Sequence, residues 1–528
     1  MDHRKEPVAQ IRLGQPADPE HCARGGATIM RRRFEQTHRW DLSLALADDA
    51  GTADTGTPLF QRISRAVITE IRRGRLRAGD RLPGTRSLAD SLLVNRNTVL
   101  AAYAELSGEG WIESSRASGT FVSRALPEIK PRDFAARSAR RKEVPSRPGF
   151  DLDAAPAAVA LSAAAIPGIQ LSSGAPDIRL APGTVLARAF RRALRRRSAT
   201  TLAYGYPHGH PDLRAALATM LAATRGLAAT SADVVVTSGS QMALDLVSRA
   251  LLRPGDAVAV EELGYRPAWL AFQQYGAKLV PIPVDPSGID VEKLSAACAT
   301  TPIRAVYVTP HHQYPTTATL SAGRRLALLD LARRQRIAVI EDDYDHEYHY
   351  DGRPVLPLAS VDRSGVVVYV GTLAKVIAPG VRLGYVVAPR PLVESIAAHR
   401  YVLDRQGDQS LECAVAEMLD QGDIQRHARR ARRIYQSRRD AAVRVLRAEL
   451  GDALSFVVPS GGIAIWTGVA PQIDVEEWAA RALKRGLIVQ TAAKYSFDGR
   501  PRPYLRLGFA ALDEEEMRVA LQRLKKCL

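Results

Sequence analysis

Lys375 could supply a reactive amine. It follows the apolar run 366–370, which favours a strand, and Arg382 comes seven residues later. A lysine held at a strand end beside an anion site can form a Schiff base with a phosphorylated aldehyde. Segment 371–384 is therefore the candidate centre of a chemical site.

A second candidate is an anion site at the segment 238–241, Ser-Gly-Ser-Gln, which follows one strand-like run and opens a helical one. Glycine lets the backbone approach a ligand closely, and the amides at a helix N-terminus bind anions. The motif is weak alone, because many turns have this composition. Its value rises because Thr372 and Arg382 flank Lys375 and could complete the same anion cup.

Carboxylates end the apolar run 337–340, where Glu341, Asp342 and Asp343 follow in sequence. A carboxylate beside a pyridinium nitrogen keeps that ring protonated, but a metal site or a solvated turn would use the same residues. Successive strand residues point to opposite sides, so only one of the two aspartates can face a bound ring. We choose Asp342.

The elements that must position these residues have a regular pattern. From Gln170 onward, short apolar runs alternate with amphipathic helical segments, which predicts a parallel α/β sheet. The predicted strands are 233–237, 257–260, 305–308, 337–340 and 366–370.

A block of helical patterns precedes this domain. Segment 58–74 has apolar residues every four positions and a glycine at its end, which predicts an amphipathic helix. Thr85 is predicted to cap a short second helix and Asn95 a third, 96–106, so that the pair forms a helix-turn-helix. Segments 111–113 and 119–122 would add the two strands of a wing.

We expect four regions in the chain. An N-terminal extension, 1–57, precedes a winged-helix head, 58–125, a linker, 126–168, and a large domain, 169–528; Met30 is an alternative translation start. The proline- and arginine-rich linker cannot bury much apolar surface. As a flexible coil of ~40 residues it would span roughly 35 Å.

The composition leaves few function classes. A net charge of +17 suits nucleic-acid binding or an arginine-rich solvated surface. No apolar run is long enough for a membrane span, and no signal peptide is evident. The four cysteines are far apart without metal-ligand spacing, so we expect free thiols, no metal and a cytoplasmic location. The basic run 426–439 is either a second DNA patch or, as we favour, an ordinary charged helix.

The head resembles the winged helix of the GntR family in four segments: 82–89 (Leu-Pro-Gly-Thr-Arg-Ser-Leu-Ala), 95–99, 102–106 and 118–122. The resemblance implies that one set of residues contacts double-stranded DNA, the last two in the minor groove: Arg86, Ser87, Arg96, Asn97, Thr98, Ser118 and Gly119. An arginine can bind guanine through two hydrogen bonds. Asn95 stands where the family usually has serine, which is also a helix cap.

The large domain resembles fold-type I aminotransferases of class I over about residues 168–528. The resemblance rests on the segments around Lys375 and Asp342 together with 204–214, 261–265 and 311–316. Because a GntR-type head precedes this domain, the chain is identified as a member of the MocR family of transcriptional regulators.

This resemblance implies pyridoxal 5'-phosphate as cofactor, joined to Lys375 as an aldimine. Asp342 would pair with the ring nitrogen, Tyr344 would bond the ring hydroxyl and Tyr265 would stack on the ring. The phosphate would be held by Gly239, Ser240, Gln241, Thr372 and Arg382, with Tyr204 from a partner subunit. Arg506 would bind an amino-acid carboxylate, and Gly174 resembles a glycine on the substrate side.

Two departures from the aminotransferase pattern put efficient transamination in doubt. Tyr314-Pro-Thr-Thr317 stands where these enzymes usually have Asn-Pro-Thr-Gly, and Ala374 replaces a common serine. We therefore favour a homodimeric regulator, with a head-to-tail arrangement as an option, that binds paired half-sites and senses the cofactor or an amino compound. A working aminotransferase with a DNA tether, and a DNA-binding protein whose large domain binds nothing, stay open. The effector (the cofactor itself, GABA, taurine or another amine) stays open as well.

Overall fold

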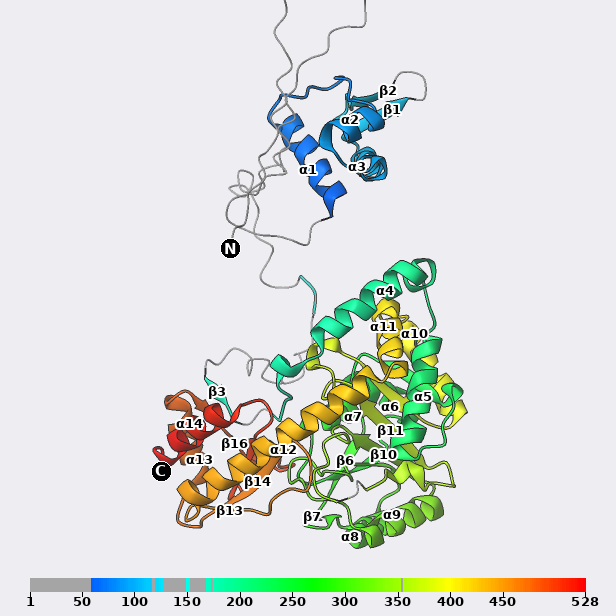
Figure 1. Cartoon of the computed structure of the whole chain (residues 1–528). Helices are drawn as coiled ribbons and strands as arrows, with labels where there is room; N and C mark the ends of the chain where they lie inside the picture. Colours follow the sequence, from blue (N-terminus) through cyan, green and yellow to red (C-terminus); the bar gives the residue numbers. More distant parts are fainter. Residues whose placement is uncertain (1–57, 116–118, 128–148, 152–167, 172–173, 353–354) are drawn as a thin grey trace, which may run out of the picture. The chain divides into compact units, whose positions relative to one another are not determined.

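Two parts of the chain carry regular structure, each with its own apolar core (Figure 1). The computed structural model describes residues 58–115, 119–127, 149–151, 168–171, 174–352 and 355–528, within two units, 1–157 and 158–528. The predicted extension 1–57, most of the predicted linker 126–168, and Ser118 lie outside the described residues.

The head contains three helices and a two-stranded sheet. These are α1 (Leu59–Arg72), α2 (Thr85–Leu92), α3 (Arg96–Gly108), β1 (Ile112–Ser115) and β2 (Gly119–Val122). Ile63, Val67 and Ile71 of α1 are buried, as their spacing predicts. β1 and β2 pair antiparallel, with Ile112 opposite Val122. The winged helix predicted from the sequence is therefore confirmed.

The two predicted helix caps had different outcomes. Asn95 caps α3, because its side-chain oxygen accepts a hydrogen bond from the backbone N–H of Asn97 at 2.8 Å. The prediction for Thr85 was wrong: Thr85 is the first helical residue of α2, and Gly84 occupies the cap position in an extended conformation without a side-chain bond.

The large unit is built on a seven-stranded mixed sheet. Its strands, in spatial order, are β4 (Val234–Thr237), β12 (Gly384–Val387), β11 (Val367–Thr372), β10 (Ala338–Asp343), β9 (Ile303–Val308), β5 (Ala257–Glu261) and β6 (Lys278–Ile282). β12 runs antiparallel to both of its neighbours, whereas the other pairs are parallel. The sequence-based expectation of a parallel sheet was wrong at β12.

Helices cover both faces of this sheet, which explains why its strands are apolar runs rather than alternating ones. One face packs on α6, α7 and α10 and the other on α5, α8, α9 and α11. Their bounds are α4 (Gly183–Thr201), α5 (Pro211–Arg225), α6 (Ser240–Leu251), α7 (Arg266–Gln274), α8 (Val291–Thr300), α9 (Ala322–Gln335), α10 (Arg390–Leu403) and α11 (Gln409–Asp420).

The C-terminal part forms a smaller layer of its own (Figure 1, orange and red). An antiparallel sheet, ordered β13 (Leu454–Ser455), β14 (Ala464–Val469), β17 (Tyr504–Gly508) and β16 (Gln490–Thr491), packs on α12 (Asp423–Leu450), α13 (Val475–Lys484) and α14 (Glu514–Lys525). Beside it, β15 (Leu487–Ile488) pairs with β3 (Ile169–Gln170), and β7 (Val284–Asp285) forms a separate pair with β8 (Gly288–Ile289). β17 supplies Arg506.

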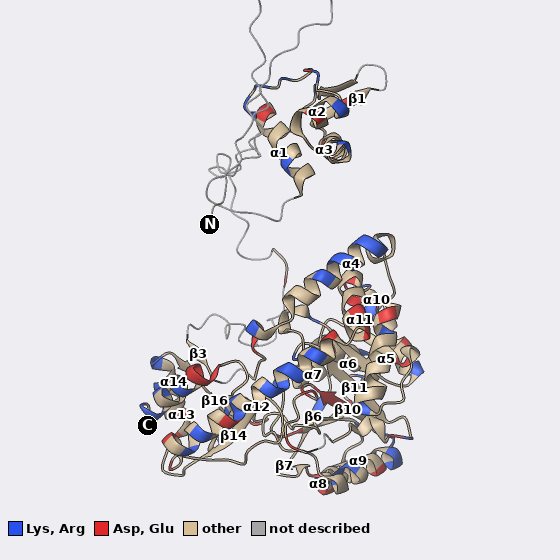
Figure 2. Ribbon diagram, in the orientation of Figure 1, with Lys and Arg blue, Asp and Glu red and all other residues tan. Residues whose placement is uncertain are grey.

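The basic run 426–439 lies within α12, as the charged-helix interpretation predicts (Figure 2). Two of its arginines are buried and paired: Arg438 binds Asp177 at 2.9 Å, and Arg439 binds Asp351. They tie the long helix to neighbouring segments. Among the described helices, none is both long and apolar enough to cross a membrane.

Candidate functional site

Lys375 lies in the turn between β11 and β12, beside the carboxyl ends of the parallel strands. Its Nζ donates a hydrogen bond to the carbonyl oxygen of Gly174 at 3.2 Å. Burial and, to a smaller extent, the neighbouring Arg506 lower the pKa of Lys375 to about 8, against the opposing charges of Asp345 and Asp342. The amine is thus much closer to its neutral, nucleophilic form than a surface lysine.

Asp342 and Asp343 lie on opposite sides of β10. Asp342 is coupled electrostatically to Lys375, and its Oδ2 accepts a hydrogen bond from Tyr307 at 2.8 Å. Its Oδ1 is buried without a hydrogen-bond partner, and burial raises the pKa of this carboxyl to about 7. A cationic N–H donor placed there would lower that pKa and satisfy the orphaned oxygen.

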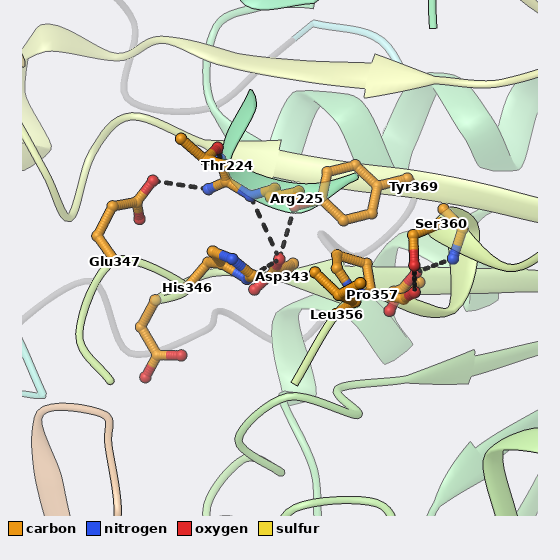
Figure 3. Close-up of polar contacts among 12 residues, drawn as sticks. Thr224, Arg225, Asp343, His346, Glu347, Leu356, Pro357, Ser360 and Tyr369 are labelled. Atoms are coloured by element: carbon orange, nitrogen blue, oxygen red, sulfur yellow. Dashed lines mark hydrogen bonds and ion pairs between the residues drawn. The ribbon is translucent and has the colours of Figure 1, made fainter. Parts of the chain in front are cut away.

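Asp343 belongs to a different network, drawn in Figure 3. Tyr369 donates to Asp343 at 2.6 Å, Arg225 Nε lies 3.6 Å away, and His346 Nδ1 lies at 3.0 Å. Burial opposes its ionisation, but His346 and Arg225 outweigh burial and hold the pKa of Asp343 well below its usual range. The negative charge of Asp343 is therefore already balanced by positively charged groups of the protein.

Arg506 brings a buried cation to the Lys375 side. Its side chain is 1% exposed, and its Nε and one terminal nitrogen have no hydrogen-bond partner. The guanidinium lies over the ring of Tyr314, with 4.8 Å between Cζ and the ring centroid. Gly174 (φ +45°) permits this arrangement, because a Cβ there would overlap the guanidinium. The orphaned fork suits a carboxylate.

Aromatic rings surround Tyr314 edge-on. The ring centroids of Tyr265 and Tyr495 lie 5.5 Å from that of Tyr314, and Tyr344 lies at 6.0 Å. Burial raises the pKa of Tyr265 to about 12, so its phenol stays neutral at ordinary pH. Tyr265 and Tyr344, predicted as cofactor contacts, are therefore gathered with Arg506 in one aromatic enclosure.

The predicted anion cup is partly assembled. Gly239 (φ +89°) precedes α6, and Arg382 donates to the carbonyl oxygen of Ser238 at 3.0 Å, against the Gly239 backbone. The first N–H groups of a helix lack acceptors within the helix, so those of Ser240 and Gln241 suit an anion. The Gln241 side chain instead donates to Pro267 at 2.9 Å.

Thr372 is held within the turn that carries Lys375, whereas Tyr204, which we expect to act from a partner subunit, lies on the surface. The buried Thr372 hydroxyl accepts from the N–H of Ala374 at 3.1 Å and donates to Leu383 at 3.4 Å, so it closes the turn. Tyr204 is 78% exposed, with the Arg405 guanidinium 4.0 Å from its ring centroid. Among described residues, no contact joins Tyr204 to Lys375.

The predicted DNA contacts lie on the head surface. Arg86 and Ser87 are exposed in the first turn of α2, Arg96 and Asn97 are exposed at the start of α3, and Thr98 is half-buried beside them. Gly119 begins β2 with φ +107°. α3 is the second helix of the helix-turn-helix and presents its N-terminal residues, the usual position for base contacts.

Comparison with known proteins accounts for both units. The family profile "Bacterial regulatory proteins, gntR family" matches residues 59–122, and "Aminotransferase class I and II" matches residues 166–524. The probable rhizopine catabolism regulatory protein MocR of Rhizobium meliloti is 32% identical over 89% of this chain and 94% of its own length. This chain belongs to the MocR family of transcriptional regulators.

Two further matches bear on the MocR-type assignment. The pyridoxine biosynthesis transcriptional regulator PdxR of Corynebacterium glutamicum is 31% identical over 91% of this chain and 97% of its own. The α-aminoadipate aminotransferase LysN of Thermus thermophilus, solved with N-(5'-phosphopyridoxyl)-L-leucine, is 26% identical and has a TM-score of 0.64. The match covers 68% of this chain and 92% of the LysN chain.

Three residues of this MocR-family site were not predicted as site residues from the sequence: Tyr307, Tyr314 and Tyr495. Tyr307 reaches Asp342 from the neighbouring strand β9, and Tyr495 follows a short 3₁₀ turn, Ala492–Lys494. Only Tyr314 had a signal, because it stands in the segment that departs from the aminotransferase pattern.

Proposed function

We propose that this MocR-family regulator binds operator DNA through its head and senses pyridoxal 5'-phosphate, or an amino compound captured by it, at Lys375. The observation that carries the proposal is the set of unsatisfied buried atoms beside Lys375: Asp342 Oδ1 and two nitrogens of Arg506. Buried polar groups without partners are rare and commonly mark a ligand site.

The cofactor fits these residues chemically. Asp342 Oδ1 would accept from a protonated ring nitrogen, Tyr265 would lie against the ring, and Tyr344 would bond its hydroxyl. The amides of Ser240 and Gln241 with Arg382 would hold the phosphate. When bound, the cofactor supplies an aldehyde that condenses reversibly with an amine and releases water. Lys375 supplies the resident amine, and its pKa of about 8 keeps a useful fraction neutral.

An effector with an amine and a carboxylate would satisfy the rest of the site. Its carboxylate would take the open nitrogens of Arg506, and its amine would compete with Lys375 for the same carbonyl carbon. The PdxR and MocR relatives are named for pyridoxine biosynthesis and rhizopine catabolism, which supports a small-molecule signal without naming this chain's own. An effector changes DNA occupancy only if it binds one arrangement of the heads better.

A homodimer is the proposed assembly, and an exposed apolar surface supports it. The α10 patch consists of Leu202, Tyr204, Tyr206, Tyr401 and Val402, all more than half exposed. The patch comes from two segments, 202–206 and 401–402, and Arg405 lies between them. The Arg405 guanidinium is 4.0 Å from the Tyr204 ring centroid and 5.4 Å from that of Tyr401. A contiguous exposed apolar patch marks an interaction surface. Two heads would then bind paired half-sites.

The test uses the full-length protein and DNA from upstream of its own gene. With pyridoxal phosphate, the wild type should gain a visible absorption band, and borohydride should fix the cofactor's mass on Lys375. Lys375→Ala should lose both signals, and the matched control Lys293→Ala, on α8, should keep them. DNA affinity should change on cofactor addition in the wild type and not in Lys375→Ala.

Two outcomes would contradict the proposal. No absorption band in the wild type would mean that the large domain does not bind the cofactor. Sustained production of keto acids from an amine donor, without any effect on DNA binding, would favour the aminotransferase alternative instead.

A further inference from the structure

Four histidines gather beyond the Lys375 site. His311 and His312 follow β9, and His346 and His349 follow the neighbouring strand β10. The ring centroid of His311 lies 4.3 Å from that of His312, 4.7 Å from that of His346 and 6.0 Å from that of His349. They make up four of the eleven histidines in the chain, so two short segments concentrate one ligand type.

Three of these rings carry nitrogens that have neither a hydrogen-bond partner nor an ion-pair partner. His311 and His349 have no hydrogen-bond partner at either nitrogen, and His312 has none at Nε2. His311 is 4% exposed and His312 is 2% exposed, so bulk water does not explain the missing partners. One nitrogen from each of the three rings lies within 4.8 Å of the others. A polar cluster of this kind calls for a ligand that accepts several lone pairs at once.

The orientation of His312 resembles that of a metal ligand. Its Nδ1 lies 2.7 Å from Asp345 Oδ1, and both side chains are 1% exposed. A carboxylate on one imidazole nitrogen fixes the ring and makes the other nitrogen a better ligand. That other nitrogen, Nε2, faces the backbone of Gly461, where a Cβ would overlap it. His312 is thus oriented by a carboxylate, and its Nε2 has no hydrogen-bond partner.

His346 has a different part in the cluster. Its Nδ1 lies beside Asp343, within the network of Arg225 and Glu347 (Figure 3). Together with His349 it lines a cavity of about 220 Å³ that also contacts Thr224, Gln425 and Arg429. The cavity leaves room for water or a small ligand beside His349.

We propose that His311, His312 and His349 bind one divalent transition-metal ion, with a position left for a ligand from the adjacent cavity. Three imidazoles favour zinc, cobalt, nickel or copper over magnesium or calcium, which prefer oxygen ligands. Bonds of about 2.0–2.1 Å would draw the nitrogens inward from their present separations. The cysteine spacing from which we expected no metal carries no information about such a site.

The chain has a second candidate group, His210, Asp212 and Cys413. Its members already have partners: His210 Nδ1 accepts from the N–H of Asp212 at 3.2 Å, and Asp212 pairs with Arg197. A metal there would have to displace these contacts, and it would bind through a thiolate. Sulfur ligation therefore distinguishes the two groups in an experiment.

The experiment uses tag-free, full-length protein stripped with a chelator and then exposed separately to Zn²⁺, Co²⁺, Ni²⁺ and Cu²⁺. After gel filtration, elemental analysis should find about one equivalent of a retained ion in the wild type. Co²⁺ should give visible d–d bands without the strong charge-transfer band that a cysteine thiolate adds.

His311→Asn and His349→Asn should each lose the retained ion. His399→Asn, which changes a histidine of α10 outside the cluster, should keep it. Circular dichroism should match the wild type for each variant; if a variant fails to fold, the wild-type cobalt spectrum alone decides. Three results would each overturn the proposal: retention of no ion by the wild type, a sulfur charge-transfer band, or full retention of the ion by folded His311→Asn and His349→Asn.

Discussion

The Arg506 guanidinium lies over the Tyr314 ring, 4.8 Å from its centroid, while two of its nitrogens have no hydrogen-bond partner. The ring therefore fixes one face of the cation and leaves its donor edge open. A buried cation that is held by packing and has open donors is suited to a carboxylate ligand. Under the proposed function, Arg506 would recognise an effector and Lys375 would capture the cofactor.

We expect Arg506→Leu to weaken the response to amino acids but not to amines that lack a carboxylate. Matched ligands are 4-aminobutyrate and butylamine, each titrated while the visible band of the cofactor-loaded protein is followed. A hydrogen bond to a charged group contributes about 1.5–3 kcal/mol, so the apparent affinity for 4-aminobutyrate should fall at least ~10-fold. The control is Arg500→Leu, which removes an exposed arginine six residues before Arg506 in the chain. Equal losses for both ligands would contradict this role.

The rate of cofactor capture should depend on the protonation of Lys375. Only the neutral amine attacks an aldehyde, and the pKa of Lys375 is lowered to about 8 by burial and by Arg506. The capture rate, measured by stopped-flow absorption, should therefore rise with pH through about 8 and then level off. In Arg506→Leu the neighbouring cation is gone, so the midpoint should move to higher pH. An unchanged midpoint would mean that burial alone sets the pKa.

The same shift predicts how stability depends on pH without cofactor. The folded pKa of Lys375 is about 8 and its ordinary value is 10.5, so the unfolded chain binds more protons between these pH values. The free energy of unfolding should then rise with pH across that window, by up to about 1.4 kcal/mol per unit from this group. Lys375→Met should have a smaller slope in denaturant titrations, and Lys293→Met should match the wild type.

The sequence was sufficient where local chemistry decides the structure. The spacing of Ile63, Val67 and Ile71 depends only on the helical period. Asn95 caps α3 by accepting a hydrogen bond from the N–H of Asn97, only two residues further along the chain. Thr85 was misplaced by one residue, because glycine also occupies the cap position and no side-chain bond marks the boundary.

Long-range register was harder to predict. Parallel neighbouring strands need a long crossover connection, usually a helix. The segment between Thr372 and Gly384 contains only the 3₁₀ turn Pro379–Val381, so β12 pairs antiparallel with β11. The contact of Tyr307 with Asp342 depends on the pairing of β9 with β10. Neither the pairing nor the arrival of Tyr495 from the C-terminal layer is visible in a single sequence.

The α10 patch should determine the oligomeric state. Val402 is the most exposed member of the patch, at 84%. A charge there would have to be buried without a partner if two copies meet on this surface. Val402→Asp should therefore convert a dimer to a monomer, measured by light scattering at several concentrations. Leu326→Asp, at a 67% exposed position on α9, should leave the assembly unchanged. A dimeric Val402→Asp protein would place the interface elsewhere.

Arg96 should contribute to sequence recognition rather than to general attraction for DNA. It is exposed in the first turn of α3, whereas Arg65 is exposed on α1. Each alanine substitution removes one positive charge, so the two variants differ only in where the charge was. Arg96→Ala should cost about 1–3 kcal/mol on the operator and little on unrelated DNA, because a base contact discriminates sequences. Arg65→Ala should slightly weaken the affinity for both DNAs. If Arg65 lies near a phosphate, this variant should also reduce the salt dependence of DNA binding.

Fluorescence anisotropy at several salt concentrations measures both effects. Equal losses on operator and unrelated DNA in Arg96→Ala would assign this residue to the phosphate backbone.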